Sequence, residues 1–161
     1  MKLSSKHSGY TLIELLLALA LMAILASLAI PMIGDEDAMN LNSAKQLLVS
    51  DIELAQVMAI SHPEDSIGVV IQQEGWHIAS LDDPATPLLD TFTGEPLITS
   101  FGIGSAASIE GVLITTNAIE NTIAFDQYGG LTDITQETQV EFSSLEYQAL
   151  VVINPTTGSI Q

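Results

Sequence analysis

The chain has 161 residues, a formal net charge of −17 and no cysteine. This length suits one modest domain with an appended segment and is too short for two ordinary domains. Without cysteine, a disulfide framework and a thiolate metal site or nucleophile are excluded. Nucleic-acid binding needs cationic side chains against the phosphates, whereas the last Lys or Arg is Lys45. We therefore expect no nucleic-acid partner.

The first 33 residues form a short basic leader followed by a long apolar run. Residues 1–9 hold two of the three lysines, and Glu14 is the only charged residue in 10–33. As a helix, 10–33 would extend about 36 Å, enough to cross the apolar core of a bilayer. Lysines before this run and acidic residues at 35–37 after it predict a cytoplasmic N-terminus and a translocated C-terminal part.

Three interpretations of this segment compete. A conventional cleaved signal peptide has a shorter apolar core, so the long run with Glu14 at its start fits it poorly. A generic single-pass anchor leaves Glu14 and the Gly9-Tyr10 junction unexplained. The third interpretation comes from resemblance: Gly9-Tyr10-Thr11-Leu12-Ile13-Glu14-Leu15 resembles the class III leader junction of type IV pilins and type II secretion pseudopilins.

The resemblance implies processing by a prepilin peptidase. The peptidase would cut after Gly9 and methylate Tyr10, which stands where the family usually has phenylalanine and keeps the aromatic character. Pro31 stands where the family commonly carries a proline that kinks the helix. The resemblance thus implies a leader over 1–9 and a transmembrane assembly helix over 10–33.

Glu14 is the candidate assembly residue. A carboxylate at membrane depth costs several kcal/mol unless it is paired or neutralised, so it is a functional candidate by default. The resemblance supplies a partner, the N-terminal ammonium of Tyr10 on a neighbouring subunit. The alternative is that Glu14 lies near the membrane surface and stays hydrated.

Residues 34–62 are expected to form an acidic break followed by an amphipathic helix. Apolar residues recur at helical spacing over 42–60, and Ser61-His62-Pro63 is a plausible stop. The apolar stripe is most simply a face packed on a sheet. We expect one long helix, with a membrane-inserted first half and an amphipathic second half, kinked at Pro31 and Gly34. The stripe consists of Ala44, Leu47, Leu48, Ile52, Ala55, Met58 and Ala59.

Residues 63–161 are expected to form a globular antiparallel β-domain under that helix, giving an α+β fold. The runs 67–71 and 76–79 flank a hairpin turn. Residues 82–96 are expected to be an irregular polar loop because they contain several prolines. Further strands are predicted at 97–101, 112–116, 122–125, 139–143 and 149–153.

Two late segments are similar to one subgroup of these proteins. Residues 123–130, Ile-Ala-Phe-Asp-Gln-Tyr-Gly-Gly, resemble a Phe-x-x-x-Gly turn in the GspH/FimT group of minor subunits. Residues 151–160 resemble the closing strand and turn of that group, although Ser159 stands where the family usually has a basic residue.

Candidate chemical sites are sparse. His62 and His77 are isolated and have no metal-ligand spacing, so we expect surface or edge histidines. Asp126 and Asp133 flank a Gly-Gly pair without the spacing of a calcium loop, and are expected to be solvated loop charges. No nucleophile motif or phosphate loop is present. We expect no metal, no cofactor and no enzymatic activity.

The resemblance implies a structural minor subunit of a type II secretion pseudopilus that polymerises through its N-terminal helix. Its partners would be other pseudopilins or pilins, the prepilin peptidase and inner-membrane lipid. The protein would span the bacterial inner membrane once, with the C-terminal domain in the periplasm. The alternatives are a minor pilin of a type IV pilus and a membrane-anchored binding module that never polymerises.

Overall fold

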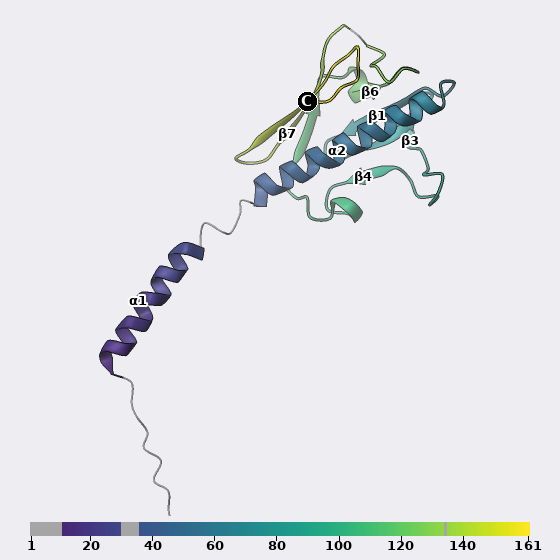
Figure 1. The fold of residues 1–161 in the computed structure, drawn as a ribbon. Coiled ribbons are helices and arrows are strands. Elements are labelled where there is room, and N and C mark those ends of the chain that lie inside the picture. The colour runs from purple at the N-terminus through teal and green to yellow at the C-terminus, as the bar shows by residue number, and fades with distance from the viewer. Residues whose placement is uncertain (1–10, 30–35, 134) are drawn as a thin grey trace, which may run out of the picture. The chain divides into compact units, whose positions relative to one another are not determined.

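A computed structural model describes residues 11–29, 36–133 and 135–161, with side chains described for 11–25 in the first range. The chain divides into two compact units, Met1–Asp35 and Glu36–Gln161 (Figure 1). The first contains helix α1 (Leu12–Ala29) and the second contains helix α2 (Glu36–Ser61) and all the strands. The predicted kink at Pro31 and Gly34 lies outside the described residues, as does the predicted continuity of the two helices.

Helix α2 confirms the amphipathic helix and extends further toward the N-terminus than the predicted 42–60. It ends at Ser61, before the predicted proline stop. The predicted stripe is the packed face, since Ala44, Leu48 and Ile52 are fully buried, while Leu47 and Met58 are partly buried against the same core.

The first sheet confirms the predicted hairpin. Strands β1 (Ile67–Gln72) and β2 (Gly75–Ser80) pair antiparallel, with Val69 opposite Ile78. The sheet has the order β3-β2-β1-β6, and β4 (Ile98–Ser100) also pairs with β2. Among the described strands, β6 (Thr122–Ala124) pairs only with β1, so it is an edge strand.

The prediction of an irregular loop over 82–96 is wrong in its first part. Strand β3 (Asp83–Pro87) pairs with β2, with a change of register between Ala79 and Ser80. Proline cannot donate to a sheet ladder, but it is tolerated on an edge strand. The prolines at 84 and 87 therefore exclude a central strand and permit this edge strand.

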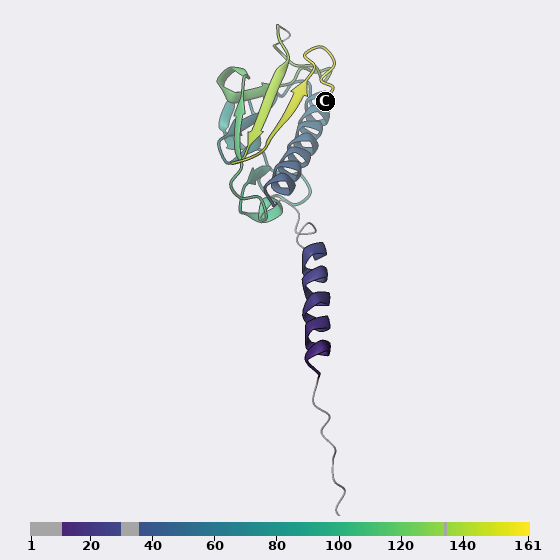
Figure 2. The same cartoon turned by 90° about the vertical axis from the view of Figure 1, so that its left-hand side faces the viewer.

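The second sheet has the order β5-β7-β8 and is also antiparallel. Its strands are β5 (Leu113–Thr116), β7 (Thr138–Ser143) and β8 (Gln148–Ile153), close to the predicted ranges. Short 3₁₀ helices cover Gly104–Ala106 (η2) and Ile119–Asn121 (η3). In both views α2 runs along the sheets (Figures 1 and 2), and it contacts strands of both.

The core lies between α2 and the two sheets. Its centre is aromatic: the Trp76 ring meets Phe101 at 5.8 Å and Phe142 at 6.5 Å, both edge to face. Leu48 and Ile52 from α2 are buried in the same cluster. The α+β architecture with a helix on an antiparallel β-domain is thus confirmed.

Candidate functional site

The N-terminus of helix α1 is capped by reciprocal hydrogen bonds between Thr11 and Glu14. The Thr11 backbone N–H and hydroxyl both donate to Glu14 Oε2, at 2.9 and 3.0 Å. In return the Glu14 backbone N–H donates to Thr11 Oγ1 at 3.3 Å. This is a capping box, in which a Thr and a Glu three residues later satisfy each other's backbone amides. The Thr-x-x-Glu spacing before an apolar run is a sequence signal that could have predicted it.

Glu14 therefore has a local role as well as its predicted assembly role. Both bonds from Thr11 end on Oε2, which leaves the acceptor capacity of Oε1 for another donor. The predicted processing residues Gly9 and Tyr10 lie outside the described residues. The pairing of Glu14 with Tyr10 of a neighbour stays a prediction.

Helix α1 exposes its apolar side chains. Leu12 is 78 % exposed and Met22 is 67 % exposed, and all the described side chains of the helix are solvent-accessible in the same way. Such a continuous apolar surface marks a membrane or protein contact in a folded protein. Among the residues that the structure describes, no helix combines the length and apolar character needed to cross a membrane.

The two late segments singled out in the sequence meet at Gln56 on α2. The Gln56 Nε2 donates to the carbonyl of Gly129 at 3.2 Å and to that of Gly158 at 2.7 Å. The N–H of Leu131, the residue directly after the first segment, donates to the Pro155 carbonyl in the second segment at 2.9 Å. One side chain of the helix thus fixes two turns that lie far apart in the sequence.

Each turn is also held by its own residues. Asp126 Oδ1 accepts the N–H groups of Tyr128 and Gly130 at 2.8 and 2.9 Å. Gly158 adopts φ +66, and a Cβ there would collide with the Gly129 carbonyl and with Gln56. Glycine is therefore required at 158 by both its backbone conformation and the close approach of the first turn.

Asp126 and Asp133 serve their own turns. Asp133 Oδ1 accepts the N–H of Thr135 at 3.0 Å and its hydroxyl at 2.6 Å. These bonds, led by the one from the hydroxyl, hold the pKa of Asp133 below its usual range. Within the described residues, no group of three or more His, Cys, Asp or Glu could hold a metal ion.

The expectation of surface or edge histidines holds for His62 and is wrong for His77. His62 is exposed just after α2, but His77 is 3 % exposed on the inner strand β2. Its Nε2 lies 2.8 Å from the Pro84 carbonyl, which must accept from it, and its Nδ1 lies 3.5 Å from Gln72 Nε2. His77 thus helps to hold the edge strand β3 on the sheet. The sequence did not indicate this role because β3 was not predicted.

A polar tie joins α2 to the first sheet. Asp51 Oδ2 accepts the indole N–H of Trp76 at 2.7 Å and the hydroxyl of Thr99 at 2.9 Å. Sequence reasoning did not single out Asp51, because nothing in the local pattern marks an acid that faces inward. Its role is to satisfy two buried donors at the helix-sheet contact.

Comparison with known proteins gives one match. Residues 4–30 match the prokaryotic N-terminal methylation motif. No curated protein and no solved structure matches the chain. The motif is the signal of type IV pilins and pseudopilins, and it supports a pilin-like family. It indicates processing by a prepilin peptidase, pilin-type polymerisation and membrane anchoring.

Proposed function

We propose that this protein is a structural, non-catalytic minor subunit of a type II secretion pseudopilus. The observation that carries the proposal is the methylation motif over 4–30, which includes helix α1, whose described side chains are exposed. Cleavage after Gly9 would create a new N-terminus at Tyr10. The segment 10–33 would hold the subunit in the bacterial inner membrane, with the leader cytoplasmic and residues 36–161 in the periplasm.

Assembly would use Glu14 in two ways. Inside the subunit, Glu14 caps helix α1 through Oε2. Between subunits, Oε1 would accept the ammonium of Tyr10 from a neighbour, which compensates the carboxylate in an apolar layer. Burial of the exposed leucines of α1 against other helices would then hold the filament.

A second contact surface lies on α2. Leu54, Val57 and Ile60 are 39, 59 and 51 % exposed near its C-terminal end. A helix of a lone globular domain would carry polar residues there. These side chains support a further subunit contact within the filament.

The net charge supports a minor subunit over a self-polymerising one. Removal of residues 1–9 would leave Lys45 as the only Lys or Arg against 20 acidic residues. A filament of identical subunits would place these charges next to one another, and such repulsion opposes assembly. A filament in which this subunit alternates with less acidic subunits avoids that repulsion.

The GspH/FimT resemblance gains support from the turn geometry. The two segments that carry it, 123–130 and 151–160, are joined through Gln56 and through the bond from Leu131 to Pro155. The departure at Ser159 lies beside this junction and leaves it intact. The resemblance favours a pseudopilus tip subunit.

The machine can be identified by purification from native membranes. Crosslinking, affinity purification and mass spectrometry should give secretion-system pseudopilins together with a chain that starts at methylated Tyr10. Pilus subunits among the partners would assign the protein to a type IV pilus with the same mechanism. An uncut leader without pilin-like partners would mean a membrane-anchored binding module instead.

Two variants separate the cap from the intersubunit pair. Glutamine serves in a capping box as glutamate does, but it carries no charge for an ammonium. Glu14→Gln should therefore be processed and inserted normally yet fail to enter the filament, as judged by crosslinking. Thr11→Ala removes the Oγ1 acceptor at a cost of about 1 kcal/mol of helix stability and should still assemble. Normal assembly of Glu14→Gln would rule out the charge pair.

A further inference from the structure

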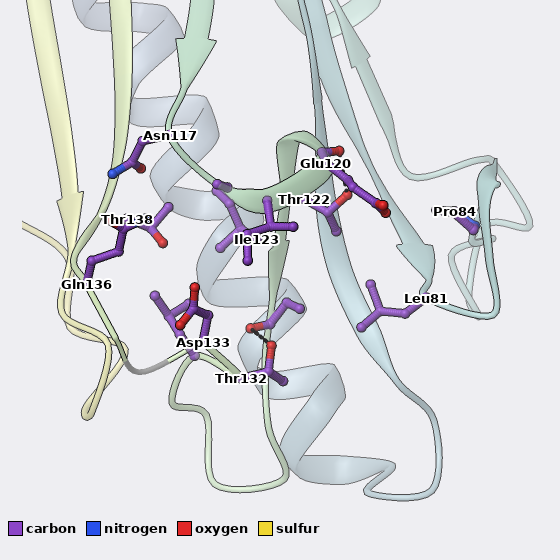
Figure 3. A pocket seen from close by; sticks show the side chains of 14 residues that line it. Leu81, Pro84, Asn117, Glu120, Thr122, Ile123, Thr132, Asp133, Gln136 and Thr138 are labelled. Carbon is purple, nitrogen blue, oxygen red and sulfur yellow. Dashed lines mark hydrogen bonds between the residues drawn. The ribbon is translucent and has the colours of Figure 1, made fainter.

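A cavity beside the edge strand β6 has no role in the function proposed above. It has a volume of about 300 Å³, at the small end of ligand pockets, and lies where residues around β6 meet the beginning of β7 (Figure 3). Ile123 and Leu131 are buried and give it an apolar floor. Its polar lining includes Asp133, Gln136 and Thr138.

Thr138 is the observation that points to a ligand. It is only 8 % exposed, yet its hydroxyl has no hydrogen-bond partner in the part of the chain that the structure describes. Every fully buried side-chain oxygen or nitrogen in the described residues has a hydrogen-bond partner. The Thr138 hydroxyl has none there, so it is not fully buried, and Thr138 lines the cavity. In Figure 3 it and the Asp133 carboxylate point toward the same hollow beside Ile123. A polar group that enters the cavity would therefore find an unused partner on a nearly buried side chain.

The charges around the cavity are all negative. Glu120 reaches the rim from η3, where its backbone adopts the left-handed region at φ 53. Asp133 has Oδ1 occupied by Thr135, and Oδ2 remains available. Because no Lys or Arg follows Lys45, the β-domain brings no Lys or Arg of its own to the cavity.

We infer that this cavity binds a primary ammonium group on an aliphatic stem, such as a lysine side chain of another protein. An ammonium has three donors and no acceptor, which matches three oxygens: Asp133 Oδ2, Thr138 Oγ1 and the Gln136 side-chain carbonyl. The stem would lie against Ile123 and Leu131. Glu120 adds to the negative potential at the entrance.

The same lining does not suit a hard metal ion. Calcium takes six to eight oxygen ligands, most of them charged or backbone carbonyls. Of the two carboxylates in the described lining, only Asp133 lies beside Thr138, because Figure 3 shows Glu120 extending toward Leu81. A singly charged group with an apolar stem satisfies both the polar and the apolar parts of the lining.

The test is an NMR titration of the ¹⁵N-labelled full chain in detergent micelles with acetyl-Ala-Lys-Ala-amide. The matched control peptide has norleucine in place of lysine, which keeps the stem and removes the charge. We expect the lysine peptide to shift the amides of Ile123, Asp133 and Thr138, and the norleucine peptide to leave them unchanged. Equal binding of the two peptides, or no shifts at these amides, would overturn the inference.

Three variants locate the binding. Asp133→Asn keeps an oxygen for the Thr135 turn but removes the charge, and should weaken binding about tenfold, as loss of a charged hydrogen bond does. Thr138→Val keeps the side-chain shape and should weaken binding severalfold. Glu137→Gln, an exposed neighbour outside the cavity, should leave binding unchanged. If Glu137→Gln weakened binding as much as Asp133→Asn, the weakening would come from the loss of net negative charge in general, and the site would be refuted.

Butylammonium chloride distinguishes the source of the ammonium group. Binding as tight as that of the lysine peptide would assign the site to a free amine, and clearly weaker binding would assign it to a protein side chain. Both results support an ammonium site. If calcium displaced the peptide at equal ionic strength and shifted the same amides, the cavity would be a metal site and the ammonium inference would be overturned.

Discussion

Replacing Asp51 with alanine removes the acceptor that the Trp76 indole and the Thr99 hydroxyl share. Trp76 is 1 % exposed, so its N–H would be left buried without a partner. An unsatisfied buried donor costs about 1–3 kcal/mol, and a hydrogen bond to a charged group contributes about 1.5–3 kcal/mol. Because both bonds end on one oxygen, they do not add fully. We expect Asp51→Ala to lower the free energy of unfolding by about 2–4 kcal/mol.

Urea unfolding of residues 36–161 measures this change. The sequence has one tryptophan, so fluorescence reports on the core directly beside the substitution. Asp51→Asn keeps an acceptor oxygen without the charge and should cost about 1 kcal/mol. Glu53→Ala, an exposed acid on the same helix, is the matched control and should change stability by less than about 0.5 kcal/mol.

A double-mutant cycle tests whether the loss comes from this tie. Asp51→Ala and Thr99→Val should be non-additive, with a coupling energy above about 0.5 kcal/mol, as expected for groups in one hydrogen-bond network. If Asp51→Ala costs no more than Glu53→Ala, the carboxylate does not stabilise the helix-sheet contact and the reasoning fails.

Two further predictions concern turns. Gly158→Ala should lower the urea midpoint, because the new Cβ meets Gln56 and the conformation at φ +66 disfavours alanine; a cost below about 1 kcal/mol would contradict the close packing. The pKa of Asp90 is lowered by bonds from the N–H groups of Thr93 and Phe92, so this carboxylate stabilises its loop above its ordinary pKa. The loop should loosen as the pH falls through the lowered pKa. The measurement is the protection of the Phe92 and Thr93 amides, that is, their hydrogen exchange relative to an unfolded peptide at the same pH, which should decrease; unchanged protection would show that the carboxylate does not hold the turn.

The sequence by itself determined the features that depend on local pattern. The methylation motif rests on a short run of residue types around Gly9, and the matched range 4–30 includes it. The spacing of Ala44, Leu48 and Ile52 repeats with the helical turn, so the periodicity alone assigns the buried face of α2. The two short apolar runs at 67–71 and 76–79, separated by a polar turn that contains glycine, likewise indicated the hairpin of β1 and β2.

Only the tertiary structure decided which distant residues meet. Gln56 and Gly158 lie 102 positions apart, and no local period shows that a helix amide holds that turn. Asp51, His77 and Thr138 read as ordinary polar residues in the sequence, and their burial depends on what packs over them. The sequence also did not show that β3 lies at the edge of the sheet, because a strand's neighbours depend on packing. A proline excludes a strand only where a neighbouring strand needs its N–H. Local periodicity specifies the elements and their faces, whereas packing between elements specifies the partners of each polar group.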